Sequence, residues 1–245
     1  MNTVTSPRVS GRRLRHGNAL PFHALTPFTM LDFPDRTACI AWVAGCNMRC
    51  GYCHNPQIVL QKGSLGEAAV LAFLERRRGL LDGVVLSGGE ATTWPGLHAF
   101  AQRATGLGFA LKLDTNGLRP EVIARLLEDE LVDRIALDYK APPLKFREVT
   151  GVAAWNRFSS TLDLLSTQDK VPFEVRTTAH ADLLDRSDLL EIARDLRRRG
   201  YRGPWTLQQA LAGPDRPTLG NLRTNPTKVD IAWLTQRSPL RIVAQ

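Results

Sequence analysis

Six short runs rich in apolar and β-branched residues recur along the 245-residue chain, and segments with helical periodicity follow them. Parallel strands need crossover connections, usually helices, so this alternation predicts a parallel sheet covered by helices. Six strand–helix units are too few for a closed eight-stranded barrel. We therefore predict an α/β fold, an open partial (β/α)6 barrel with a parallel sheet. The predicted strands span residues 37–43, 83–87, 110–114, 134–138, 173–178 and 205–209.

The net charge of +8 is concentrated near the N-terminus, where no acidic residue precedes Asp32. This N-terminal segment is poor in large apolar residues, so we expect residues 1–20 to form a basic flexible tail and residues 21–245 to form one domain. A basic tail can contact nucleic acid or an acidic protein, and it can equally be a solvated extension. Aromatic residues do not interleave with the other basic runs as single-strand binding requires, so we expect no specific nucleic-acid partner.

The longest apolar run, residues 38–48, lies between Arg36 and Arg49. It is shorter than the roughly 20 residues that span a bilayer, so we expect no membrane partner. The N-terminal sequence lacks the apolar core of a signal peptide, which predicts a cytoplasmic protein. In that compartment the four cysteines are not expected to form disulfides.

Polar residues follow every predicted strand. The carboxyl ends of parallel strands meet at one edge of a sheet or barrel, and this edge carries the active site in barrel enzymes. The sequence therefore predicts a catalytic face at this edge. The polar residues there are Cys46, Ser87 to Glu90, Asp114 to Gly117, Asp138 to Lys140, Thr178, His180, Gln208 and Gln209.

Cys46, Cys50 and Cys53 form a C-x3-C-x2-C pattern in the stretch GCNMRCGYCHNP, just after the first predicted strand. Thiolates bind zinc or iron–sulfur clusters. A structural zinc site usually takes four ligands as two separated pairs, and the sequence offers no second pair. His54 would have to fold back on its own loop, and Cys39 lies inside a predicted strand. We favour a cluster with one open iron, with zinc and unligated core cysteines as alternatives.

This cysteine spacing, with the aromatic Tyr52 before the last cysteine, resembles the radical S-adenosylmethionine (SAM) superfamily. The chain is similar in particular to the activating proteins of anaerobic ribonucleoside-triphosphate reductase and other glycyl radical enzymes. The matching pieces occur in order between residues 24 and 210 and are jointly specific. They are MLDFPDRTAC, GCNMRCGYCHNP, RRRGLLDGVVLSGGEATTWPGL, LKLDTNG, ALDYKAPP and FEVRTTAH.

The resemblance implies that Cys46, Cys50 and Cys53 hold a [4Fe-4S] cluster, with SAM chelating the fourth iron. Reductive cleavage of SAM would then give a 5′-deoxyadenosyl radical. The radical SAM domain of residues 21–245 would install a glycyl radical on a partner enzyme, anaerobic ribonucleotide reductase, with an electron donor such as flavodoxin or ferredoxin. A radical SAM enzyme that acts on a small molecule and a zinc-stabilised binding module are the alternatives.

The same resemblance implies contacts with SAM. Gly88 and Gly89 would let the backbone approach the methionyl group, whose ammonium would donate to their carbonyls and to Glu90. A simple turn is the alternative for this segment. Many relatives carry proline after the glutamate, where this chain has Ala91. The backbone at Tyr52 would meet the adenine.

Five further residues complete the expected site. Asp114 and Asn116 would contact the ribose or the methionyl group, although an Asx turn that ends in a left-handed Gly117 explains them equally plainly. His180 would contact SAM or be a hydrogen-bonded loop histidine. Asp138 and Lys140 would form an ion pair.

Overall fold

The computed structural model describes residues 20–210, 218–220, 222 and 229–244. Residues 1–19, which make up nearly all of the predicted basic tail, lie outside the described residues. The division of the chain into a tail and one domain therefore stays a prediction.

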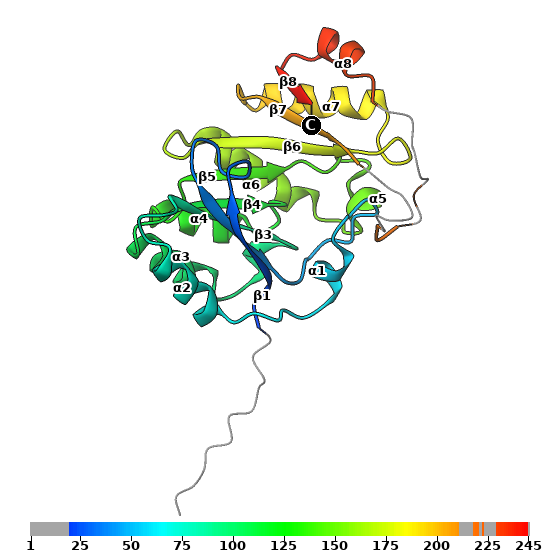
Figure 1. The fold of residues 1–245 in the computed structure, drawn as a ribbon. Coiled ribbons are helices and arrows are strands. Elements are labelled where there is room, and N and C mark those ends of the chain that lie inside the picture. Colours follow the sequence, from blue (N-terminus) through cyan, green and yellow to red (C-terminus); the bar gives the residue numbers. More distant parts are fainter. Residues whose placement is uncertain (1–19, 211–217, 221, 223–228, 245) are drawn as a thin grey trace, which may run out of the picture.

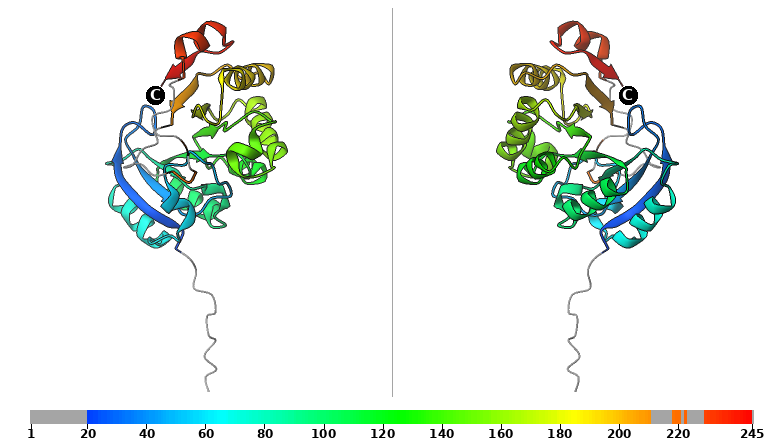
Figure 2. Two further views of the ribbon diagram at one scale, coloured as in Figure 1. Left: turned by 90° about the vertical axis from the view of Figure 1, so that its right-hand side faces the viewer. Right: turned by 90° about the vertical axis from the view of Figure 1, so that its left-hand side faces the viewer.

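An eight-stranded sheet forms the centre of the molecule, and its strands lie side by side in the order of the sequence (Figure 1). β1 is antiparallel to β2, and each later pair of neighbours is parallel. The sheet curves into a partial barrel whose edge strands, β1 and β8, do not pair with each other (Figure 2). The strands are β1 (Phe22–Thr29), β2 (Ala38–Val43), β3 (Gly83–Gly88), β4 (Ala110–Thr115), β5 (Arg134–Asp138), β6 (Phe173–Ala179), β7 (Trp205–Gln209) and β8 (Ile242–Ala244).

Strands β2 to β7 match the six predicted strands to within one residue at each end, so the predicted open barrel with a parallel sheet is confirmed. The two edge strands were not predicted. β1 contains Pro27, and its pairing with β2 is irregular between Phe22 and Ala24 and between Thr26 and Thr29. Irregular pairing breaks the alternation that marks a strand in a sequence. β8 has only three residues, too few to show a period.

The helices cover the outer face of the sheet (Figure 2). α7 shows how local sequence starts one of them: the Asp185 side chain accepts hydrogen bonds from the backbone of Ser187 and Asp188 and so caps the free amides of its first turn. The helices are α1 (Pro56–Leu60), α2 (Glu67–Arg76), the 3-10 turn η1 (Ala91–Thr93), α3 (Leu97–Gly106), α4 (Pro120–Glu128), α5 (Phe146–Thr150), α6 (Trp155–Thr167), α7 (Arg186–Arg198) and α8 (Ile231–Arg237). None of the helices in the described part of the chain is long and apolar enough to cross a membrane.

Alternation along the strands separates two sets of buried side chains. One set, which includes Cys39, Leu86 and Leu113, belongs to the main core beneath the helices. The other set, which includes Ile40 and Val85, fills the opposite face of β2 and β3 near the start of these strands. The carboxyl ends of the strands are left for polar groups.

Candidate cofactor site

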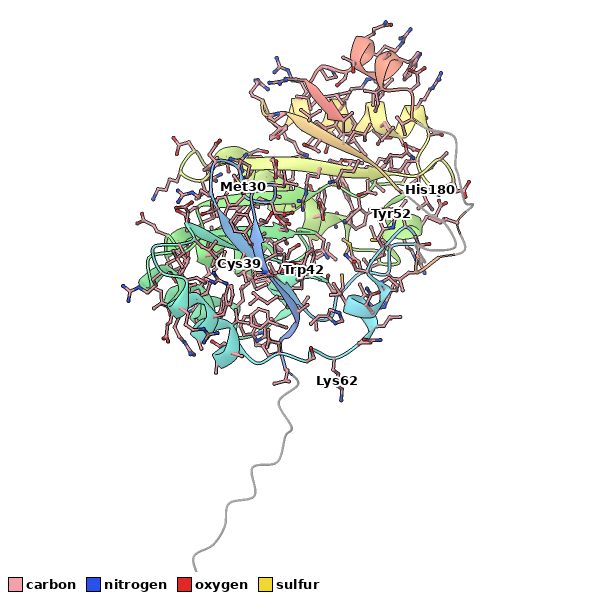
Figure 3. All side chains as sticks on the ribbon, in the orientation of Figure 1. Met30, Cys39, Trp42, Tyr52, Lys62 and His180 are labelled. Atoms are coloured by element: carbon pink, nitrogen blue, oxygen red, sulfur yellow. The ribbon has the colours of Figure 1, made fainter. Side chains whose placement is uncertain are left out.

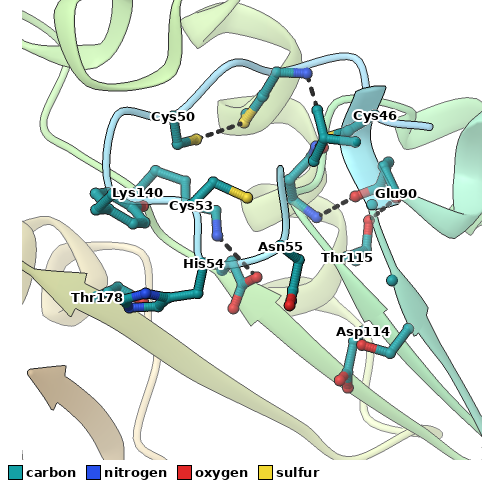
Figure 4. A pocket seen from close by; sticks show the side chains of 18 of the residues that line it. Cys46, Cys50, Cys53, His54, Asn55, Glu90, Asp114, Thr115, Lys140 and Thr178 are labelled. Atoms are coloured by element: carbon teal, nitrogen blue, oxygen red, sulfur yellow. Dashed lines mark hydrogen bonds and ion pairs between the residues drawn. The ribbon is translucent and has the colours of Figure 1, made fainter. Parts of the chain in front are cut away.

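A cavity with about 890 Å³ of space, part of it open to solvent, lies at the carboxyl ends of strands β2 to β6 (Figure 4). Its wall combines these strand ends with the loop between β2 and α1. This is the edge at which the sequence predicts a catalytic face. The predicted polar residues that line the cavity are Cys46, Tyr52, Cys53, Cys50, Ser87, Gly88, Gly89, Glu90, Asp114, Thr115, Asn116, Asp138, Lys140 and Thr178.

The cysteine loop, residues 44–55, is held at several points by the rest of the fold. Gly45 donates a backbone hydrogen bond to Ile58 of α1, at 2.8 Å, and Arg49 donates one to Thr150 at the end of α5, also at 2.8 Å. The Arg49 guanidinium also donates to the carbonyls of Cys46 and Met48, both at 2.7 Å. These bonds fix the loop shape without using any of the cysteine side chains.

All three cysteines of the motif line the cavity. The backbone amide of Met48 donates to Cys46 Sγ at 3.4 Å, and Cys50 Sγ lies 4.0 Å from Met48 Sδ. Among the described residues, no three His, Cys, Asp or Glu side chains converge to hold a single metal ion. Thiolates are soft ligands of both zinc and iron–sulfur clusters.

Cys39 lies in β2, apart from the loop that carries Tyr52 (Figure 3). Its side chain is fully buried in the main core, and burial raises the pKa of its thiol to about 12. This environment is that of a small apolar core residue. Burial likewise raises the pKa of Cys46 to about 12. A metal that binds Cys46 must therefore displace a tightly held proton.

Gly88 and Gly89 are required by backbone packing against the cysteine loop. A Cβ atom on Gly88 would collide with the backbone of Val43, and one on Gly89 would collide with the carbonyl of Gly45. The close approach allows Gly89 to donate to the Val43 carbonyl and Glu90 to donate to the Gly45 carbonyl, both at 2.9 Å. The resemblance implies that these glycines make room for a ligand. In the structure they also make room for the loop.

Glu90 is almost fully buried, at 2% exposure, and its carboxylate joins the ends of β3 and β4. One oxygen accepts hydrogen bonds from the Thr115 hydroxyl, at 2.8 Å, and from Thr92. The other accepts from the backbone amide of Asn116 at 2.6 Å. Burial raises the pKa of Glu90, and these hydrogen bonds oppose the rise. The carboxylate is thus engaged by protein donors at both oxygens.

Asn116 joins the end of β4 to the cysteine loop. Its Oδ1 accepts from the Leu118 backbone amide at 3.1 Å, and Gly117 has φ of +75°, so the Asx turn is present. Its Nδ2 donates to Asn47 Oδ1 at 2.8 Å and lies 3.8 Å from Cys46 Sγ. The turn therefore positions an amide beside a motif cysteine.

A chain of ion pairs crosses the cavity wall from β4 to β6. Lys112 Nζ lies 2.7 Å from Asp114, and Arg176 contacts both Asp114, at 3.4 Å, and Asp138, at 3.1 Å. Lys140 forms the expected pair with Asp138 at 3.0 Å. Burial alone would raise the pKa of Asp138, but Lys140 and Arg176 outweigh it and hold that pKa below its usual value. Charges of both signs are thus fixed in the wall.

Residues 218–220 lie against the cysteine loop. Leu219 donates a backbone hydrogen bond to Cys53 at 3.3 Å, and Gly220 donates one to Gly51 at 2.8 Å. Leu219 also lines the cavity. A Cβ atom on Gly220 would come within 2.9 Å of Gly51 Cα, so only glycine allows this approach without movement.

The sequence profile of the radical SAM superfamily matches residues 40–202, which include the cysteine loop and most of the parallel sheet. The chain belongs to the radical SAM superfamily. This membership implies a [4Fe-4S] cluster and SAM as cofactors.

Two curated proteins are similar to this radical SAM protein in sequence. The "Putative glycyl-radical enzyme activating enzyme MJ1227" of Methanocaldococcus jannaschii is 31% identical over 179 residues, which cover 71% of this chain and 74% of the relative. The "AdoMet-dependent heme synthase" of Methanosarcina barkeri is 27% identical over 178 residues, which cover 68% of this chain and 50% of the relative. The chain thus spans half the length of the heme synthase.

The fold is also similar to that of a solved structure. The crystal structure of Streptococcus suis SuiB bound to S-adenosylmethionine matches with a TM-score of 0.64 at 12% identity, over 82% of this chain and 48% of SuiB. The likeness supports the architecture of this radical SAM protein, an open sheet of mostly parallel strands surrounded by helices.

The residues of the cavity fit the two cofactors of the superfamily. Three thiols on one anchored loop are soft ligands suited to iron. The wall beside them carries Asp114 and Asp138 as well as Lys140 and Arg176, so it offers partners for both the ammonium and the carboxylate of a methionyl group.

Five of the residues expected at this edge do not line the cavity: Gly117, Tyr139, His180, Gln208 and Gln209. His180 is fully buried, and its Nδ1 accepts from the Asp182 backbone amide at 3.1 Å. Gln208 and Gln209 end β7, one strand beyond the last strand that lines the cavity. The structure thus places His180 as a hydrogen-bonded loop histidine.

Lys112 and the role of Arg176 in this radical SAM protein were not predicted from the sequence. Lys112 is a lysine at 2% exposure in the otherwise apolar start of β4. A charged residue inside a short apolar strand could have indicated this ion pair, because a buried lysine requires a partner of opposite charge.

Proposed function

We propose that this radical SAM protein is an activating enzyme that installs a glycyl radical on a partner enzyme. The observation that carries the proposal is the similarity to MJ1227, which is 31% identical over 71% of this chain and bears the name of a glycyl-radical enzyme activating enzyme. The partner we propose is anaerobic ribonucleoside-triphosphate reductase, with flavodoxin or ferredoxin as the electron donor.

In this proposal Cys46, Cys50 and Cys53 hold the cluster. Bound there, the cluster and SAM would supply one-electron radical chemistry. The loop is already anchored through Gly45 and Arg49, so little rearrangement of its backbone is needed when the thiols bind iron. Cys39 takes no part, because its side chain belongs to the core on the other face of β2.

The polar wall of the cavity would bind and orient SAM. Lys140 and Arg176 supply positive charge for the methionyl carboxylate, and Asp114 and Asp138 supply negative charge for the ammonium or acceptors for the ribose. The carbonyls of Gly88 and Gly89 and the backbone at Tyr52 complete the proposed contacts. Because the ion pairs hold these groups in place before SAM arrives, binding costs little reorganisation.

In this proposal Glu90 and Asn116 mainly position the strand ends and the cysteine loop. Glu90 fixes the end of β3 to the end of β4, and Asn116 fixes the end of β4 to Asn47 of the cysteine loop. The cluster ligands and the SAM-binding strand ends are therefore joined by hydrogen bonds. Leu219 covers one side of the cavity, which limits the access of water to a reactive radical.

The proposal is tested with anaerobically reconstituted protein, a chemical or flavodoxin reductant, SAM and the anaerobic ribonucleotide reductase of the same organism. We expect 5′-deoxyadenosine and a glycyl radical signal in electron paramagnetic resonance (EPR) spectra. Cys46→Ser should abolish both products, whereas Cys39→Ser should retain them. A protein that cleaves SAM at the same rate without the reductase, and never produces the glycyl radical, would contradict the proposal.

The similarity to the heme synthase favours a second candidate, a radical SAM enzyme that acts on a small molecule. Such an enzyme would use the same cysteines and the same SAM-binding wall. It is distinguished by SAM cleavage that responds to a small-molecule substrate rather than to a glycyl radical enzyme.

A further inference from the structure

Strand β2 contributes an aromatic side chain, Trp42, to the lining of the cavity. Among the described strand residues that line the cavity, no other is aromatic. The Trp42 side chain packs on the apolar cluster that includes Ile40 and Val85, on the face of β2 turned away from the helices. It is partly exposed, so part of the ring surface is available to a molecule in the cavity.

The single polar atom of the Trp42 side chain is already engaged within the protein. Its Nε1–H donates to Thr26 Oγ1 of the edge strand β1 at 2.9 Å. Thr26 is the register partner of Ile40, two positions before Trp42, so the bond runs diagonally between neighbouring strands and limits the rotation of the indole. A molecule in the cavity therefore meets only the apolar ring of Trp42.

The rest of the strand wall is polar and has a proposed use. Asp114, Asp138, Lys140 and Arg176 lie at the ends of β4 to β6, and we propose that they bind the charged groups and the ribose of SAM. The adenine is proposed to meet the backbone at Tyr52, in the cysteine loop, which Figure 3 shows apart from Trp42. The Trp42 ring is therefore cavity surface to which no part of SAM has been assigned.

Trp42 also lies close to the open side of the partial barrel. Only β1 separates its strand from the edge of the sheet, and β1 does not pair with β8 (Figure 2). A folded partner enzyme is far too large for a cavity with about 890 Å³ of space, so only a short segment of its chain can reach the site. A flat apolar ring near an open edge suits such a segment.

We propose that the Trp42 ring packs against the backbone of the partner segment that carries the reactive glycine, and so positions its Cα–H bond. The inference rests on the proposed function, because it names the part of this site that meets the glycyl radical enzyme. A glycine has no Cβ atom, so its backbone can lie flat against a ring. Aromatic side chains in such contacts often contribute much of the binding free energy. Trp42 is in this way a substrate-contact residue, and Thr26 positions it.

The experiment compares wild type, Trp42→Ala and Trp42→Phe, all anaerobically reconstituted, with the anaerobic ribonucleotide reductase as the probe. Iron analysis and SAM calorimetry report on the cofactor site, and EPR gives the rate of glycyl radical formation at each reductase concentration. We expect Trp42→Ala to raise the KM for the reductase at least about fivefold, as for loss of one aromatic contact, with iron content and SAM affinity unchanged. Trp42→Phe keeps a ring and should recover most of this loss.

Trp233→Ala is the matched control. Trp233 lies on α8, where its ring contacts the guanidinium groups of Arg186 and Arg237, and it does not line the cavity. Its KM for the reductase should equal that of wild type.

An unchanged KM for the reductase in Trp42→Ala would overturn this inference and leave the proposed function standing. Weaker SAM binding in Trp42→Ala with an unchanged KM for the reductase would also overturn it, because the ring would then serve SAM. Wild-type protein that forms no glycyl radical on the reductase would overturn the inference and the proposed function together.

If Trp42→Ala does not fold, 5-fluorotryptophan is incorporated at the five tryptophans of the otherwise unchanged chain. The fluorine resonance that is absent from the spectrum of Trp42→Phe is then that of Trp42. We expect this resonance to shift when the reductase is added to reconstituted protein that already holds SAM. A resonance that responds to SAM but not to the reductase, or to neither, would overturn the inference.

Discussion

The carboxylate of Glu90 accepts a hydrogen bond from the backbone amide of Asn116 at 2.6 Å, across 26 positions of sequence. Asn116 in turn donates to Asn47, next to Cys46. The ends of two parallel strands and the cysteine loop are therefore connected through one buried carboxylate. A substitution at Glu90 should therefore affect both the stability of the fold and the position of the cysteine loop.

Glu90→Gln is expected to lower the free energy of unfolding by about 1–3 kcal/mol, because the new amide group cannot accept from the donors that the carboxylate now satisfies. We also expect weaker SAM binding by the reconstituted protein. Urea unfolding and calorimetry measure the two effects. Glu128→Gln, at an exposed position of α4, is the control and should change neither. Wild-type stability in Glu90→Gln would mean that the buried carboxylate is dispensable.

The cysteines are expected to fall into two groups. Cys46→Ser, Cys50→Ser and Cys53→Ser should each lose the intact cluster, as measured by iron content and visible absorbance. Cys39→Ser should keep both, with a stability loss of about 1–3 kcal/mol for a hydroxyl placed in the apolar core. Equal iron loss in Cys39→Ser would require a four-cysteine site and would contradict an open iron.

Gly89→Ala is expected to reduce both iron content and SAM binding. Its Cβ would collide with the carbonyl of Gly45, which directly precedes Cys46, so the loop must shift. Gly106→Ala, at the end of α3, places its Cβ where nothing lies within 4 Å and should be neutral or slightly stabilising. If Gly89→Ala loses SAM binding but keeps all of its iron, the glycine serves the ligand rather than the loop.

Asp138→Asn is expected to destabilise the protein without its cofactors by about 2 kcal/mol near neutral pH. The loss is smaller than the roughly 3–5 kcal/mol of a broken, fully buried pair, because the Asp138 side chain is 25% exposed. The folded pKa of Asp138 lies below its ordinary value of 3.8. Its stabilisation is therefore present above that value and is lost as the pH falls through the folded pKa.

The difference in unfolding free energy between wild type and Asp138→Asn should thus shrink as the pH is lowered from neutral to about 3. Urea unfolding of both proteins across this range measures it. A difference that stays constant with pH would show that the charge of Asp138 is not what stabilises the wall.

Gly220→Val is expected to displace residues 218–220 from the cysteine loop, because its Cβ would come within 2.9 Å of Gly51 Cα. The reconstituted cluster should then lose its visible absorbance several times faster in air than that of wild type, with the same initial iron content. Gly106→Ala is again the control. Equal rates of loss in all three proteins would mean that these residues do not shield the cluster.

The strands of the parallel sheet and the place of the three cysteines were predictable, because both depend on local patterns. Apolar runs such as 134–138 mark buried strands, and strand polarity then brings their ends to one edge. The edge strand β1 was missed because Pro27 and two irregular pairings break its alternation.

Apart from the Asp138–Lys140 pair and the Asx turn of Asn116, the partners of the polar wall residues were not predicted. Lys112 and Arg176 reach carboxylates on neighbouring strands, and the sequence does not tell which face of a strand meets which neighbour. The packing of Gly89 could not be predicted for the same reason, since its neighbour Gly45 lies on a different segment. His180 was expected either to contact SAM or to be a hydrogen-bonded loop histidine, and its ring accepts a hydrogen bond from the backbone of its own loop.

The attachments of the cysteine loop bear on when the protein can mature. The loop that carries the metal ligands hydrogen-bonds to Thr150 and to Gly220, both of which are synthesised long after Cys53. A nascent chain that has just exposed its cysteines therefore lacks the residues that shape their loop. Iron should be inserted after translation has passed residue 220, into a barrel that is already formed, and delivery machinery would have to recognise the finished fold rather than the emerging motif.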